Sequence, residues 1–159
     1  MSALFAGPLV SPFLWYDQNA LEAAQFYVSV FPNSRMLGEM KTDVDSPNLP
    51  PKGKPIVVSF ELDGLKVTAM NGGPHQKLTP AFSFVVSCKN QQEIDHYWSK
   101  LTEGGGAEVA CGWLTDKFGL SWQIVPANIG ELVSNPKGFQ AMMGMKKLVI
   151  AELEAAARE

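Results

Sequence analysis

The sequence predicts an α+β protein in which one βαβββ unit occurs twice. Two observations predict this fold: a helix-start pattern that recurs at a fixed spacing, and a strand hairpin centred on glycine that follows each helix. We expect one domain over 1–159, with a first unit at about 9–71, a second at about 80–126, and a helical C-terminal tail over 127–159.

The helix-start pattern is a capping box, in which an Asn and a Glu three residues later each satisfy a free backbone N–H of the first turn. It occurs at Asn19–Glu22 and again at Asn90–Glu93, a separation of 90 − 19 = 71 residues. Short apolar runs at 9–16 and 81–86 precede the two helices and are typical of strands. The order of strand and helix is therefore duplicated.

The predicted hairpins continue the repeat. Residues 56–62 turn at Asp63-Gly64 into 65–70, and residues 113–117 turn at Phe118-Gly119 into 120–125. The two glycines are 119 − 64 = 55 residues apart, so the first unit is 71 − 55 = 16 residues longer. The excess falls in Lys41–Pro55, whose Pro, Asp, Asn and Gly content predicts a loop.

Composition excludes some partners and suggests others. The net charge is −3 and no Lys/Arg-rich run occurs, so we expect no binding to nucleic acid or anionic membranes. Met1–Pro8 has no signal-peptide pattern, which predicts a cytoplasmic protein with Cys88 and Cys111 as free thiols. Charged residues make up only 18%, which hints at a homodimer that hides apolar surface.

Several segments together resemble a known family. They are Ser11–Trp15, Phe31–Ser34, Asn71–His75, Cys111–Trp113, Asp116–Gly119 and Ser121–Gln123. They look like the PhnB-like branch of the vicinal oxygen chelate superfamily, whose members are often labelled 3-demethylubiquinone 3-methyltransferase-like. The resemblance implies the glyoxalase/bleomycin resistance/dihydroxybiphenyl dioxygenase fold, with two pseudo-symmetric units that form cupped mixed sheets. It also implies a homodimer that binds a small organic molecule.

In the superfamily, the metal ligands come from the first and last strands of each unit. The resemblance therefore implies metal-binding side chains on those strands. The predicted first strands, 9–16 and 81–86, contain no His, Glu, Asp or Cys, and the last strands offer only Thr68 and Gln123. A neutral amide is a weak ligand, so we predict no metal site. A divalent metal held by Gln123, His75 and water is the alternative.

Gln123 and His75 are the candidate catalytic residues. Gln123 stands where related metal enzymes have a glutamate, and His75 follows a Gly/Pro turn in which an imidazole can meet a ligand. Their structural alternatives are a buried amide bonded to backbone and an exposed loop histidine. By alternation along the strand, Trp122 points away from Gln123, so at most one of them faces the cup.

Candidate substrate-binding residues are Trp15, Thr68, Asn71 and Trp113. The tryptophans can stack on a planar ligand, although they also fill cores, and an Asn-Gly pair also simply forms turns.

The leading functional hypothesis is a small-molecule-binding glyoxalase-fold protein of unassigned substrate, either a metal-independent enzyme or a binder. Three alternatives stay open: a divalent-metal-dependent isomerase, lyase or dioxygenase; a drug-sequestering module; and a methyltransferase. The last is disfavoured because Gly72-Gly73 follows a hairpin strand and Gly104–Gly106 follows a helix. Neither stands between a parallel strand and a helix, as a nucleotide-binding turn does.

Overall fold

The computed structural model describes residues 4–159, and Met1–Ala3, part of the predicted leaderless N-terminus, lie outside the described residues. The chain divides into two compact units, the first ending at Leu78 and the second covering Thr79–Glu159. Each unit is described by itself. That they work together as one domain stays a prediction.

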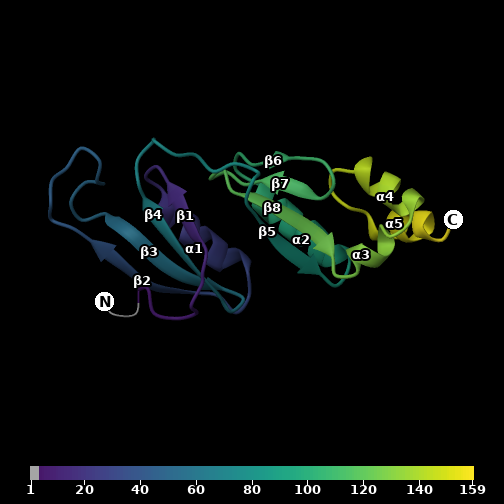
Figure 1. Ribbon diagram of the computed structural model, residues 1–159, viewed down its shortest axis with the longest axis horizontal. Helices are drawn as coiled ribbons and strands as arrows, with labels where there is room; N and C mark the ends of the chain where they lie inside the picture. Colours follow the sequence, from purple (N-terminus) through teal and green to yellow (C-terminus); the bar gives the residue numbers. More distant parts are fainter. Residues whose placement is uncertain (1–3) are drawn as a thin grey trace. The chain divides into compact units, whose positions relative to one another are not determined.

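Unit 1 is a four-stranded mixed sheet with one helix (Figure 1). Its strand order is β1-β4-β3-β2; β1 runs parallel to β4, and the other neighbours are antiparallel. The elements are β1 (Phe13–Tyr16), α1 (Ala20–Val30), β2 (Arg35–Lys41), β3 (Pro55–Leu62) and β4 (Leu65–Asn71).

Unit 2 repeats this arrangement in the order β5-β8-β7-β6, again with the first strand parallel to the last. Its elements are β5 (Ser83–Cys88), α2 (Gln91–Thr102), β6 (Ala107–Glu108), β7 (Trp113–Thr115) and β8 (Ser121–Pro126). The duplicated βαβββ order confirms the predicted fold class, and the loop at 42–54 confirms where the first unit is longer.

The register of the sheets refines the repeat. Phe13 lies opposite Thr68 in unit 1, and Val85 lies opposite Gln123 in unit 2. The last strands match at 123 − 68 = 55 residues, as predicted, but the first strands match at 85 − 13 = 72 rather than 71. The link from strand to helix is therefore one residue shorter in unit 2.

The first strand of each unit is displaced from its predicted bounds. The predicted strand 9–16 begins only at Phe13, and Leu9 and Val10 are 102% and 84% exposed. Pro12 has no N–H to donate to a sheet ladder, which explains why the strand begins after it. The strand predicted over 81–86 runs from Ser83 to Cys88, so it does contain a cysteine.

One predicted capping box is confirmed and the other is wrong. In α2, the Glu93 N–H donates to Asn90 Oδ1 over 2.9 Å and the Lys89 N–H donates to Glu93 Oε2 over 2.8 Å. In α1, Asn19 makes no side-chain capping bond, and the Ala20 N–H instead donates to Asn71 Oδ1 over 2.8 Å. Asn19 has φ −118° and ψ 29°, outside the extended conformation that directs an N-cap side chain at the helix.

Each helix packs on one face of its own sheet. In unit 1, Tyr27 of α1 stacks at a tilt on Phe60, and its hydroxyl lies 2.9 Å from the hydroxyl of Tyr16. In unit 2, α2 buries its apolar stripe. The buried residues of α2 are Ile94, Trp98 and Leu101, and those of β7 and β8 on the same face are Leu114, Trp122 and Ile124.

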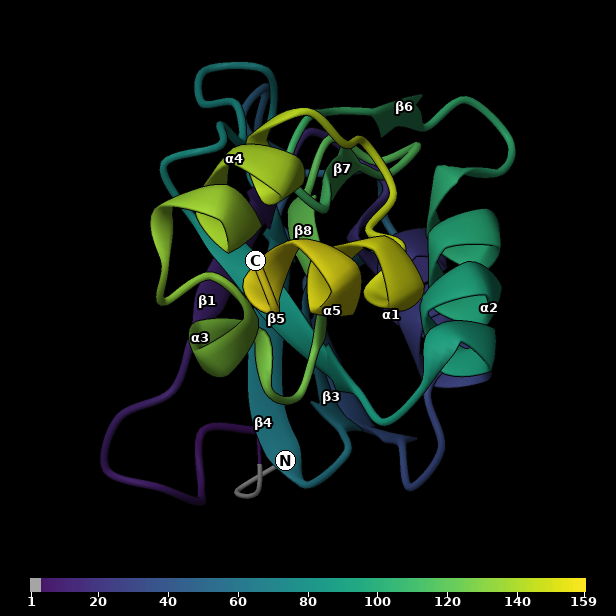
Figure 2. The same cartoon turned by 90° about the vertical axis from the view of Figure 1, so that its right-hand side faces the viewer.

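The predicted helical tail consists of α3 (Ile129–Leu132), α4 (Pro136–Met143) and α5 (Ile150–Ala157), which face the viewer in Figure 2. Leu132, Leu148 and Leu153 form its buried cluster. Gln91 ties the tail to α2, because its amide donates to the Leu148 carbonyl over 3.0 Å and accepts from the Ile150 N–H over 2.8 Å. Within 4–159, no helix is both long and apolar enough to cross a membrane.

Candidate functional site

Each sheet has a second face, pointing away from α1 or α2, which we call the distal face. Alternation along the strands puts Thr68 of unit 1 and Gln123 of unit 2 on it, because Ala69 and Trp122 beside them face the helices. This confirms that Trp122 and Gln123 point to opposite sides. The indole N–H of Trp122 donates to Asp116 Oδ2 over 2.8 Å in the core.

A matched row of side chains crosses each distal face at the same register. In unit 1 the row is Phe13, Thr68 and Ser59, on β1, β4 and β3. In unit 2 the corresponding row is Val85, Gln123 and Trp113, on β5, β8 and β7. Two of the predicted substrate-binding residues and one predicted catalytic residue therefore lie in these rows.

The row of unit 2 holds a partly buried amide between apolar neighbours. Gln123 Nε2 donates to Ser83 Oγ over 3.0 Å, which fixes the side chain against β5. Its Oε1 accepts no hydrogen bond from the part of the chain that the structure describes. Val85 beside it is 59% exposed, and Trp113 on the other side is partly buried. The amide oxygen is thus an available acceptor, with Val85 and Trp113 on either side of it.

The row of unit 1 holds two hydroxyls. Ser59 and Thr68 are opposite each other in the sheet and are 0% and 3% exposed. Ser59 Oγ is the one buried side-chain N or O atom among residues 4–159 that has no hydrogen-bond partner. Sequence reasoning missed Ser59, because it lies within an apolar strand run and only the register shows which face it occupies.

Trp15 stands beside this row and is held by the segment that leaves β4. Its indole N–H donates to the Gly73 carbonyl over 3.0 Å. Gly72 lies under the ring: a Cβ there would lie 2.3 Å from Trp15 Cε2, so only glycine fits. The structure therefore joins two sequence-predicted features, Trp15 and the Asn71–His75 segment.

Asn71 is buried, and both the oxygen and the nitrogen of its amide form hydrogen bonds with backbone groups. Besides accepting from Ala20, it donates through Nδ2 to the Pro55 carbonyl over 2.9 Å. It thus ties β4 to the starts of α1 and β3. This geometry supports a structural role, and its predicted contact with a substrate stays a prediction.

His75 lies in the loop after β4 and is exposed. The imidazole is accessible to solvent and to ligands, as the sequence predicts, and its role in catalysis stays a prediction. His96, the other histidine, is exposed on α2 against the Tyr97 ring.

The residues present do not fit the metal that glyoxalase-fold enzymes hold. No group of three His, Cys, Asp or Glu side chains suited to a metal ion occurs within residues 4–159. The distal rows offer two hydroxyls and one neutral amide, whereas Zn²⁺ and Fe²⁺ sites need imidazole, thiolate or carboxylate. We derive no chemical step through a metal.

Both cysteines are free thiols, as predicted. Burial, together with the nearby Glu93 carboxylate, raises the pKa of the Cys88 thiol to about 11. Cys88 is therefore a protonated, unreactive thiol at neutral pH. Cys111 is half-buried, with Sγ 4.0 Å from Met143 Sδ.

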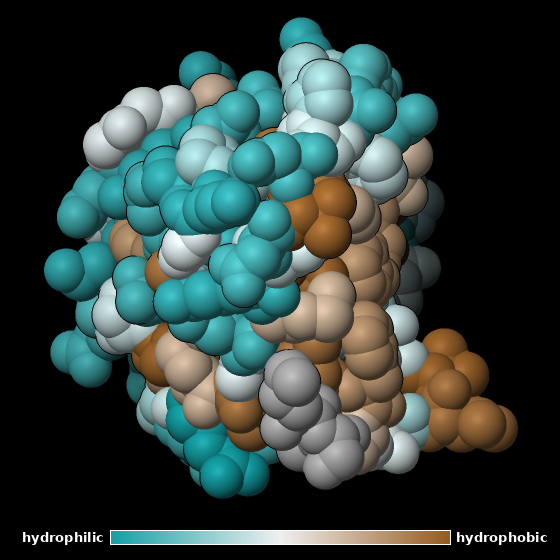
Figure 3. All heavy atoms as spheres, turned by 90° about the vertical axis from the view of Figure 1, so that its left-hand side faces the viewer, coloured by the Kyte–Doolittle hydropathy of each residue, from teal (hydrophilic) through white to brown (hydrophobic). Residues whose placement is uncertain are grey.

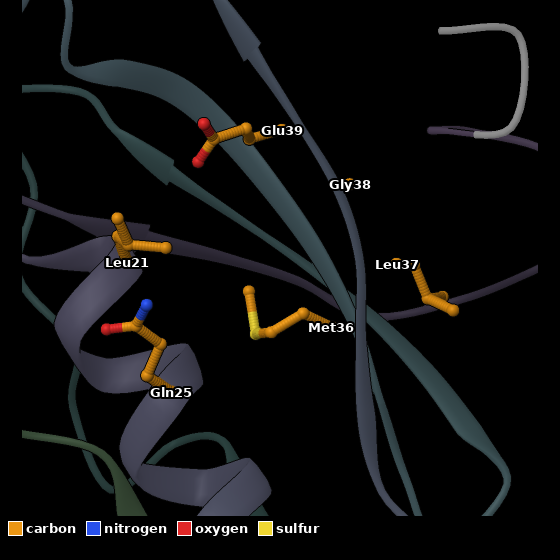
Figure 4. Close-up of a pocket in the computed structure, with 6 residues that line it drawn as sticks. All are labelled: Leu21, Gln25, Met36, Leu37, Gly38 and Glu39. Atoms are coloured by element: carbon orange, nitrogen blue, oxygen red, sulfur yellow. The ribbon is translucent and has the colours of Figure 1, made fainter.

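A separate groove lies on the other side of unit 1, between α1 and the edge strand β2. It has a volume of about 340 Å³ and is lined by Leu21, Gln25, Met36, Leu37, Gly38 and Glu39. Figure 4 shows the Gln25 and Met36 side chains pointing toward one another across it, with Leu37 directed away. The groove is open to solvent and holds no residue predicted from the sequence.

The fold and the matched rows define the class of the protein: it has the glyoxalase fold of the vicinal oxygen chelate superfamily. The model of the family described as 3-demethylubiquinone-9 3-methyltransferase matches residues 8–125, and the chain belongs to this family. A comparison with curated proteins found none that matches the chain.

Several solved structures are also similar to this chain. The PhnB protein from Bacillus cereus is 30% identical with a TM-score of 0.68, over 76% of this chain and 100% of that one. Protein PA1353 from Pseudomonas aeruginosa is 19% identical with a TM-score of 0.60, over 74% and 96% of the two chains. The fosfomycin resistance protein FosX from Listeria monocytogenes, solved with Mn(II) and sulfate, is 14% identical with a TM-score of 0.53, over 82% and 98%. The last two likenesses show the fold alone.

Proposed function

We propose that this protein binds a small organic molecule on the distal faces of its sheets. The observation that carries the proposal is the Gln123 row. There an amide is fixed by Ser83 and keeps a free acceptor oxygen, between the exposed Val85 side chain and the Trp113 ring. A few placed polar groups in an apolar surround are typical of small-molecule sites.

The residues have distinct roles in this proposal. Gln123 accepts a hydrogen bond from the ligand, and Trp113 packs against its planar part. In unit 1, Thr68 supplies a hydroxyl and Trp15, anchored through Gly73, supplies the aromatic wall. Asn71 maintains the frame, because its amide joins β4 to α1 and β3.

A catalytic role would fall to Gln123 and to His75. Imidazole is the side chain most often used in general acid–base catalysis, and His75 is exposed in the loop after β4. A methyltransferase site is not supported. Gly72-Gly73 follows β4 and Gly104–Gly106 follows α2, so neither lies between a parallel strand and a following helix.

We also expect a homodimer in the cytoplasm. Unit 1 exposes several large apolar side chains, and Figure 3 shows apolar atoms gathered along one side of the molecule. A protein surface of this kind is often covered by a partner. The exposed apolar residues of unit 1 are Phe5, Leu9, Val10, Phe13, Val44 and Leu65.

Phenol tests the proposal, because it offers a flat ring and one hydrogen-bond donor. NMR-monitored titration of the intact protein gives its dissociation constant. Replacing Gln123 by Leu should weaken phenol binding roughly five- to tenfold, since one hydrogen bond of about 1 kcal/mol is lost. Gln92→Leu is the matched control, because Gln92 is exposed on α2. Equal affinities of wild type and Gln123→Leu would refute the role of Gln123.

A further inference from the structure

The fold supplies no hydrogen-bond partner for the Ser59 hydroxyl. Its hydroxyl is fully buried, yet no group of the described chain, residues 4–159, bonds to it. A buried hydroxyl without a partner costs free energy, and native proteins seldom keep one without a reason. The β3 strand could carry Ala or Val at this position at lower cost.

Thr68 places a second hydroxyl next to that of Ser59. Its side chain lies directly opposite Ser59 on the same face, at a Cβ separation of about 5 Å for cross-strand pairs. No hydrogen bond joins the two hydroxyls, because Ser59 Oγ has no partner; among residues 4–159 it is the one buried side-chain N or O atom of which this is true. One buried, unpartnered hydroxyl therefore lies beside a second hydroxyl on the same face.

We infer that Ser59 and Thr68 together bind the carbonyl oxygen of an uncharged, largely apolar ligand; this rests on the proposed function and names its substrate class. A carbonyl oxygen has two lone pairs, so one atom satisfies both hydroxyls. Apolar side chains surround the pair and match the rest of such a ligand. They are Phe13, Trp15, Val57 and Met70.

A charged ligand fits less well. A carboxylate or phosphate buried at this row would meet two neutral hydroxyls, and desolvation of an ion needs compensating charge. The one cation on this face of β4 is Lys66, 7% exposed, whose Nζ donates to the Ala6 carbonyl. Lys66 is thus engaged by the N-terminal segment.

The same segment borders the distal face of β4. Gly7 packs on the Lys66 side chain, so residues 6–7 lie against the distal face at the Lys66 end. Residues 4–12 form no helix or strand and leave Phe5, Leu9 and Val10 more than half exposed. The segment is tied to β4 at both ends, by the Lys66 bond to Ala6 and by the Thr68 N–H, which donates to the Pro12 carbonyl over 3.1 Å.

Acetophenone and ethylbenzene test the inference, because they have the same size and differ in one carbonyl oxygen. NMR-monitored titration of the intact protein with each should show wild type preferring acetophenone roughly thirtyfold, from two hydrogen bonds of about 1 kcal/mol each. Ser59→Ala and Thr68→Val should each reduce that preference to about fivefold, the effect of the one remaining bond, without changing ethylbenzene affinity. Ser87→Ala, an exposed serine on the distal face of unit 2, should keep it.

The outcomes separate the inference from the proposed function. Equal binding of both probes would overturn the carbonyl assignment and leave small-molecule binding intact. Absence of binding by either probe would overturn both. The melting temperature of Ser59→Ala should stay level or rise, because no partner is lost; a clear drop would mean that the hydroxyl bonds within the fold, and would overturn the inference.

Discussion

The two units have the same strand order and the same register, yet their matched rows carry opposite chemistry. Unit 1 presents two buried hydroxyls, which donate, and unit 2 presents an amide oxygen, which accepts. At the position of the small Ser59, unit 2 has the bulky Trp113. The two faces therefore suit different polar groups and different ligand sizes.

The difference teaches which parts of the repeat are constrained. The helix-facing side must be apolar in both units because it forms the core. The distal side is free to change, since alternation separates it from the core. Under the proposed function, the differences between the distal faces would set which ligand each unit binds.

Substitutions in the hairpin turns should give the largest difference between the units in the loss of unfolding free energy. Asp116 in unit 2 is buried, and its carboxylate accepts from the N–H groups of Phe118 and Leu120 and from the Trp122 indole. We predict that Asp116→Ala lowers the free energy of unfolding by about 3–4 kcal/mol, because three buried donors lose a charged acceptor. Urea denaturation measures it.

Asp63, the aspartate at the turn of the unit 1 hairpin, is the control. It is exposed at a φ of 47°, and its carboxylate has no hydrogen-bond partner among residues 4–159. Asp63→Ala should lower the free energy of unfolding by about 1 kcal/mol, because alanine tolerates a left-handed backbone less well than aspartate does. Equal losses for the two variants would refute the distinction between the turns.

Substitutions at the helix starts should give a smaller difference between the units in the loss of unfolding free energy. Asn71→Ala should cost about 2 kcal/mol, because the Ala20 N–H and the Pro55 carbonyl both lose a buried partner. Asn90→Ala should cost about 1 kcal/mol, the usual effect of losing an N-cap. Asn19→Ala should cost less than about 0.5 kcal/mol, since its side chain caps nothing. Thermal or urea denaturation that ranks Asn19 with Asn90 would contradict this account.

Much of the fold could be predicted from the sequence because its signals are local. The second capping box, both hairpins and the loop insertion lie within a few residues of the pattern that predicts them. The true cap of α1 could not be predicted in this way, because Asn71 lies 51 residues from Ala20. A contact over that separation depends on the sheet, which brings the end of β4 to the helix.

The site could be predicted only in part for the same reason. Thr68 and Gln123 follow from their matched spacing after the hairpin glycines, and the structure puts both on the distal faces. Ser59 depends on strand register and on burial, neither of which a composition pattern contains. The groove between α1 and β2 depends on packing and had no sequence signal.

Amide chemical-shift mapping on ¹⁵N-labelled protein, titrated with acetophenone and with phenol, tests the central claim most directly. The account predicts the largest shifts at Ser59 and Thr68 for acetophenone and at Gln123 and its strand neighbours for phenol. Largest shifts along Met36–Glu39, the groove of unit 1, would contradict it and assign ligand binding to the opposite side of the sheet.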